Sequence, residues 1–114
     1  MIEEWLLNEE EQNQTIPIGE RVYSIRLYAF RSLMYIDIKR DDIDIITGKR
    51  VMTNAWLLPS YEAADNGNMR FETYSADKNS YVWWEDFNNK FRLCAYGADE
   101  ITEMEKEDKE DKEG

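Results

Sequence analysis

The strongest constraint in this sequence is an alternation of apolar and polar side chains with a period of two residues. In one run, Tyr23, Ile25 and Leu27 fall on one face while the residues between them are polar. This is the pattern of a β-strand that buries a single face. Similar alternation recurs along the chain, and no stretch shows the 3.6-residue period of a long amphipathic helix. The sequence therefore predicts an all-β fold.

The strands are expected to be short and antiparallel, because turn-forming residues interrupt the alternation at short intervals. The runs expected to form strands are residues 14–18, 21–28, 33–38, 43–47, 50–58, 69–74, 81–84 and 90–96. Pro17 lacks the N–H that a central strand must donate, so the first strand is expected at a sheet edge. Gly48 and Lys49 predict a hairpin turn, and residues 76–79 predict another. The predicted architecture is a single small barrel or sandwich of about eight short strands.

The length of 114 residues fits one domain, and a hydrophobic content of 42% is sufficient for a core. The predicted organisation is an N-terminal docking segment at residues 1–12, a β domain at residues 13–97 and an acidic tail at residues 98–114. In the first segment, Ile2, Trp5 and Leu6 have the spacing of one face of a helical turn. A helix this short is not stable alone, so we expect it to dock on its own domain or on a neighbour.

The charge of the chain is negative and unevenly distributed. The net charge is −11, and residues 99–114 contain nine acidic residues and three lysines, which leaves −5 for the rest. Direct binding to the nucleic acid backbone is therefore electrostatically disfavoured. The composition of the tail indicates a solvated end, either disordered or a frayed helix, and the functional alternative is an extension that orders against a basic partner.

The residue types that most enzymes and metal sites use are scarce. The chain has no histidine and one cysteine, Cys94, which excludes an internal disulfide, a clustered zinc site and a Ser-His-Asp triad. Acidic loop groups remain at Asp41, Asp42 and Asp44 and at Glu85 and Asp86. Neither group has the ligand spacing of a calcium loop, and both are interpreted as solvated carboxylates. We expect no catalysis, no metal and no cofactor.

Aromatic and apolar side chains are the best candidates for contact with another protein. Trp83 and Trp84 are adjacent, so on a strand they would point to opposite faces, one into the core and one toward a partner, a loop or a small ligand. The acidic balance disfavours base stacking on the exposed indole. The candidate interface residues are Ile2, Trp5, Leu6, Trp56, Trp83, Trp84 and Phe87.

Five short motifs occur in a recognisable order. They are Asn-Gln-Thr-Ile-Pro-Ile at 13–18, Tyr-x-Ile-x-Leu within 20–28, Tyr-Ile-Asp-Ile at 35–38, Ile-Thr-Gly leading to a double leucine within 46–58, and Glu-Asp-Phe-Asn leading to Arg-Leu-Cys-Ala-Tyr within 85–96. In this order they resemble the small baseplate plug or hub-associated family of contractile-tailed phages. The chain departs from the family pattern at Tyr35, where tryptophan is more usual, and in its two terminal extensions.

The resemblance implies a virion structural protein at the centre of a tail baseplate, without catalysis. It would contact tube and hub proteins above the spike, in multiple copies within a symmetric assembly. No apolar run reaches the length of a secretion signal or a membrane span, so we expect synthesis in the host cytoplasm and no membrane partner. The alternative is a soluble acidic inhibitor that mimics DNA and acts on a host protein.

Overall fold

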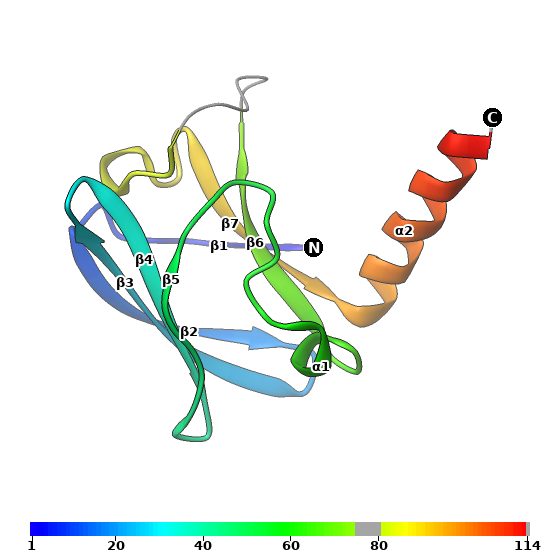
Figure 1. Cartoon of the computed structure of the whole chain (residues 1–114), viewed down its shortest axis with the longest axis horizontal. Helices are drawn as coiled ribbons and strands as arrows, with labels where there is room; N and C mark the ends of the chain where they lie inside the picture. The colour runs from blue at the N-terminus through cyan, green and yellow to red at the C-terminus, as the bar shows by residue number, and fades with distance from the viewer. Residues whose placement is uncertain (75–80, 114) are drawn as a thin grey trace.

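The computed structural model describes residues 1–74 and 81–113, and in these residues seven strands form two antiparallel sheets (Figure 1). One sheet has the order β2-β3-β4-β5, with β2 (Glu11–Ile18), β3 (Arg21–Phe30), β4 (Leu33–Arg40) and β5 (Ile43–Arg50). The other has the order β1-β7-β6, with β1 (Ile2–Glu4), β6 (Gly67–Thr73) and β7 (Phe91–Gly97). The helical elements are α1 (Ser60–Ala63), the 3₁₀ turn η1 (Trp84–Asp86) and α2 (Ala98–Glu113).

The two sheets face each other across one hydrophobic core (Figure 1). Tyr23, Ile25 and Leu27 of β3 are buried, as their alternation predicts, and so are Phe91 and Leu93 of β7. The mostly β expectation is therefore confirmed. Pro17 lies in β2, an edge strand, as its missing N–H requires.

The sheets do not close into a barrel, so the barrel alternative is wrong. The reason lies in residues 51–58, which the sequence predicts as part of a long strand. This segment runs beside β6 with one isolated bridge, Thr53 to Phe71, and with the N–H of Leu57 donating to the Met69 carbonyl at 3.0 Å. Such sparse pairing links the two sheets without forming a continuous ladder.

Strand β5 runs through Gly48, where the sequence predicts a hairpin turn, and that prediction is wrong. Gly48 has a φ of +63°, and its N–H donates to a carboxylate oxygen of Asp37 at 2.7 Å. The pairing of β4 with β5 shifts register between Ile36 and Lys39. The glycine therefore belongs to a bulged part of the ladder, which lengthens β5 instead of ending it.

Two other local expectations are also wrong. The N-terminal residues form β1, which pairs with β7 (Ile2 opposite Ala95), and not a helical turn. Residues 81–84 are not a strand, because Trp84 begins the 3₁₀ turn η1. The turn expected at residues 76–79 lies outside the described residues.

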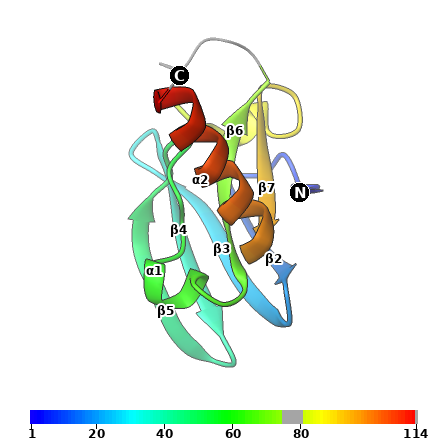
Figure 2. The same ribbon diagram turned by 90° about the vertical axis from the view of Figure 1, so that its right-hand side faces the viewer.

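The expected acidic tail is a helix of 16 residues, α2, which begins directly after β7 and leads away beside the three-stranded sheet (Figure 2). Glu100 caps the first turn of α2, because its carboxylate accepts a hydrogen bond from the N–H of Gly97 at 3.1 Å. The same carboxylate forms an ion pair with the N-terminal amine of Met1. Asp99 and Glu100 in the first turn also suit the positive end of the helix dipole. These local interactions explain why an acidic sequence is helical here.

The connection from β5 to β6 is held by a buried carboxylate on α1. Glu62 is only 4% exposed and accepts hydrogen bonds from Arg40 of β4, with Nη2 at 2.8 Å. It also accepts from Arg21 Nη1 at 2.9 Å and from the Tyr23 hydroxyl at 2.8 Å, both on β3. The bonds from Arg40 lower the pKa of Glu62 from its ordinary value, against the opposing effect of burial.

We predict that Glu62→Gln lowers the free energy of unfolding by about 2 kcal/mol, because two guanidinium groups lose their buried partner. The folded-state pKa of Glu62 is depressed, so its stabilisation is complete above the ordinary glutamate pKa of about 4.3 and is lost as pH falls through the folded value. Urea unfolding at several pH values measures both effects. The control is Glu9→Gln, an exposed site with the same charge change. Equal stability of the two variants at neutral pH would show that the Glu62 network is dispensable.

Candidate partner-binding surface

The most exposed large apolar side chains near the N-terminus lie on and just after β1. This strand is one of the two outer strands of the three-stranded sheet. Ile2 is 59% exposed and Trp5 is 74% exposed. An indole exposed to this extent gains little from its own fold and can bury a large apolar area against another surface.

Side-chain amides attach this N-terminal segment to the body, and so determine where Trp5 is presented. Asn88 receives the N–H of Leu6 at 3.2 Å and donates to the Leu6 carbonyl. Gln12 makes the same reciprocal pair with Leu7. Asn8 donates toward the carbonyls of residues 84, 85 and 87. Residues 6 and 8 are therefore connected through hydrogen bonds to the loop that contains η1, and residue 7 is connected to β2.

Leu6 and Phe87, which the sequence nominates as contact residues, are inside the core. Leu6 is fully buried and Phe87 is 1% exposed, stacked on Phe71 with ring centroids 5.7 Å apart. The chain's own side chains cover both residues, so neither belongs to the accessible surface. Leu6 is the buried anchor next to the exposed Trp5.

Trp83 and Trp84 do not divide between two faces, because this segment is not a strand. Both indoles are half-buried and lie against each other with centroids 6.1 Å apart. Trp83 Nε1 donates to Glu85 at 3.3 Å, whereas among the described residues Trp84 Nε1 is buried without a hydrogen-bond partner. The expectation of one buried and one exposed indole is therefore corrected.

Trp56 lies away from the N-terminal segment, over the outer side of the three-stranded sheet. The guanidinium of Arg70 is 4.5 Å from the Trp56 ring centroid, and Tyr96 meets the same ring edge-on at 5.7 Å. This half-buried aromatic and cationic stack holds the loop that carries Trp56 against the sheet.

Glu72 is the centre of a polar cluster that sequence reasoning missed. It accepts hydrogen bonds from Arg70 at 2.9 Å, from Arg92 at 3.3 Å and from the Tyr96 hydroxyl. Burial opposes the charge of Glu72, yet the bonds from Tyr96 and Arg70 lower its pKa. Cross-strand pairing of β6 with β7 creates the cluster, so only a correct strand register could have revealed it.

The polar cluster is not arranged for nucleophilic chemistry. Burial, with Glu72 nearby, raises the pKa of the Cys94 thiol to about 11, which keeps it protonated at neutral pH. Burial and the bond to Glu72 raise the pKa of Tyr96 to about 12. Cys94 is fully buried.

The acidic loop groups are surface features of hairpins and turns. Asp41 and Asp42 have φ values of 52° and 64° and form the tip between β4 and β5, while Asp44 pairs with Lys39 at 3.7 Å. Across the described residues, no group of three or more His, Cys, Asp or Glu side chains is placed to hold a metal ion. No helix in the same part of the chain combines the length and apolar character needed to span a membrane.

Comparison with protein-family models identifies a related family. A family model described as cyanophage baseplate Pam3 plug gp18 matches residues 2–98. The matched region includes all seven described strands and ends where α2 begins. No curated protein matches the chain.

We predict that Asn88→Gly loosens the N-terminal segment without straining the backbone, because Asn88 has a φ of 66° that glycine adopts readily. Loss of the two bonds to Leu6 is expected to lower stability by about 1–2 kcal/mol and to speed amide exchange in residues 2–7. Hydrogen exchange followed by NMR measures this. The control is Asn54→Gly, an exposed site with a φ of 58°. The bonds of Asn88 to Leu6 and of Gln12 to Leu7 are together called the amide clamp. Unchanged protection of Leu6 in Asn88→Gly would mean that the amide clamp does not hold the segment.

Proposed function

The chain belongs to the cyanophage baseplate Pam3 plug gp18 family, and we propose that it is a structural protein at the centre of a phage tail baseplate that binds the neighbouring tube and hub proteins. The observation that carries this proposal is the family match, which spans 2–98 and so includes both sheets and the core between them. The family is described as a baseplate plug, which agrees with a role in assembly and not in catalysis. It also indicates a location in the virion tail.

The N-terminal surface is the part of the molecule best suited to a protein contact. It presents Ile2 and Trp5 on a segment whose position the amide clamp defines, so little conformational freedom is lost when a neighbour covers them. Buried tryptophans are common anchors of protein interfaces. Trp83 and Trp84, on the loop bonded to this segment, are proposed as secondary contacts, and Trp56 as a contact on a separate face.

The proposed assembly contains the chain in more than one copy. Baseplates are symmetric bodies, and a repeated plug must present the same surface to each equivalent neighbour. We propose that the neighbours are proteins and that the chain does not bind nucleic acid directly, because its net charge of −11 repels a phosphate backbone.

The test is incorporation of the chain into tail particles. We expect the wild-type protein to co-purify with tails at fixed stoichiometry, and Trp5→Ala to reduce its occupancy about tenfold or more, because a central anchor contributes about 2 kcal/mol or more. Quantitative mass spectrometry of purified tails measures the occupancy.

The matched control is Tyr61→Ala, because Tyr61 is on α1 and is 74% exposed, the same fraction as Trp5. This variant should be incorporated normally. Absence of the wild-type chain from purified tails would contradict the structural role. Equal loss or equal retention of the two variants would contradict the assignment of the contact to Trp5.

A further inference from the structure

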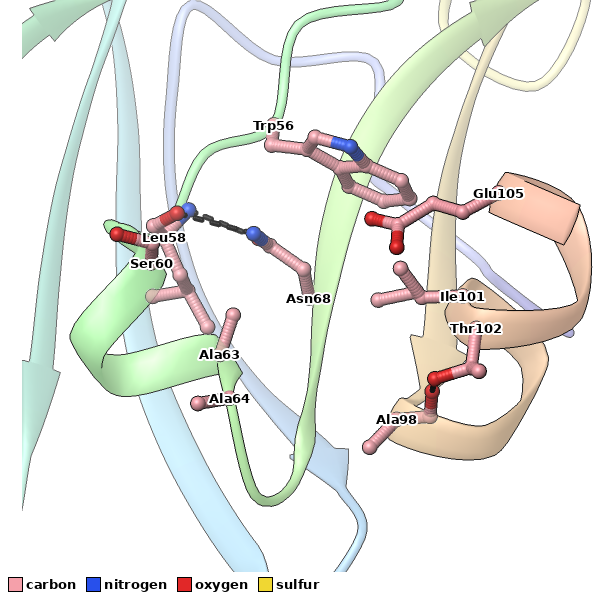
Figure 3. A pocket seen from close by; sticks show the side chains of 10 residues that line it. All are labelled: Trp56, Leu58, Ser60, Ala63, Ala64, Asn68, Ala98, Ile101, Thr102 and Glu105. Atoms are coloured by element: carbon pink, nitrogen blue, oxygen red, sulfur yellow. Dashed lines mark hydrogen bonds between the residues drawn. The ribbon is translucent and has the colours of Figure 1, made fainter. Parts of the chain in front are cut away.

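A groove separates α2 from the connection between β5 and β6, on the side of the molecule that carries Trp56. Its volume is about 520 Å³. The groove-lining residues are Trp56, Leu58, Ser60, Ala63, Ala64, Asn68, Ala98, Ile101, Thr102 and Glu105 (Figure 3). A space of this size accommodates one or two large side chains of a bound segment.

The two walls of the groove have different origins. One wall is α1 with its flanking loop, where Asn68 holds the loop by accepting the Leu58 N–H at 2.8 Å and donating to the Leu58 carbonyl at 2.9 Å. The other wall is α2, which begins at residue 98, where the family match ends. The groove is therefore completed by a helix that lies almost entirely outside the matched region.

The face of α2 toward the groove changes from apolar to acidic along its length. Ala98, Ile101, Thr102 and Glu105 are spaced at i, i+3, i+4 and i+7, which places them on one side of the helix. Figure 3 shows Ile101 and Glu105 directed toward the opposite wall, with the Glu105 carboxylate beside Trp56. The groove thus has a mainly apolar lining and a carboxylate near Trp56.

From this geometry we propose that the groove binds a segment of a neighbouring baseplate protein that combines apolar side chains with basic ones. An apolar side chain of that segment would fill the space between Ala63 and Ile101, and a lysine or arginine beside it would pair with Glu105. This inference rests on the proposed function only in taking the segment from a neighbouring baseplate protein. The chemistry of the occupant is inferred from the groove itself.

Charge complementarity favours this occupant over a second copy of the chain. The described side chains of α2 include Asp99, Glu100, Glu103 and Glu107 in addition to Glu105, and Lys106 among them pairs with Glu103 at 3.7 Å. A second copy carries the same net charge of −11, so seating it in this groove would bring like charges together. The negative charge of α2 would instead attract a basic segment and speed its encounter with the groove.

The test uses the isolated full-length chain and a short synthetic peptide that alternates leucine with lysine. NMR titration should show saturable binding, with shifts concentrated at the groove-lining residues. Matched peptides with serine in place of leucine, or glutamate in place of lysine, should bind at least about tenfold more weakly. Because purified tails are not needed, this test can fail while incorporation succeeds, and the reverse.

Three variants locate the binding. Glu105→Lys should weaken binding at least about tenfold relative to Glu103→Lys, which has the same charge change on another face of α2. Ala63→Phe, which fills the groove without changing charge, should cause a similar loss. Circular dichroism checks that each variant is folded, and Ala64→Phe replaces Ala63→Phe if that variant is not.

Several outcomes would overturn the proposal. Equal affinity of Glu105→Lys and Glu103→Lys would show that the peptide follows the overall charge of the helix and not the groove. Absence of saturable binding, or shifts confined to other surfaces, would show that the groove does not take a basic segment. Concentration-dependent self-association that Ala63→Phe abolishes would identify a second copy as the occupant instead.

Discussion

The buried carboxylate of Glu62 is the interaction on which much of this structure depends. Residues 51–66, one of two connections between the sheets, make few ladder hydrogen bonds, so this connection needs another source of order. Glu62 supplies it by accepting bonds from Arg21 and Tyr23 of β3 and from Arg40 of β4. The cost of burying the charge is offset by three donors, two of them cationic. This network fixes α1 and with it one wall of the groove that α2 completes.

A second set of polar contacts has a comparable role at the N-terminus. Reciprocal amide pairs from Gln12 and Asn88 satisfy the backbone of Leu7 and Leu6, so a segment without regular structure is held in place beyond β1. Leu6 is thereby buried while its neighbour Trp5 remains in solvent. The fold and the proposed contact are linked by this local arrangement.

The sequence could predict the parts of the fold that depend on a local period. Strands β3, β4 and β7 follow from alternation, because each buries one face against the core. It could not predict β1, because Ile2, Trp5 and Leu6 have helical spacing and the strand exists only through pairing with β7, about ninety residues away. The aromatic residues at 81–84 predict a strand, whereas Trp83 and Trp84 lie half-buried together around η1. The groove combines residues near 56, 63 and 101, and no local pattern joins them.

The family was recognisable from the order of short motifs, although its individual motifs are mostly strand-forming apolar residues that many β proteins share. The proposed role as a plug within a tail baseplate is tested by a cryo-electron microscopy map of the assembled tail. Density for both sheets is expected at the centre of the baseplate, with the Trp5 indole covered by another chain. A resolved baseplate that lacks this fold would rule out that role.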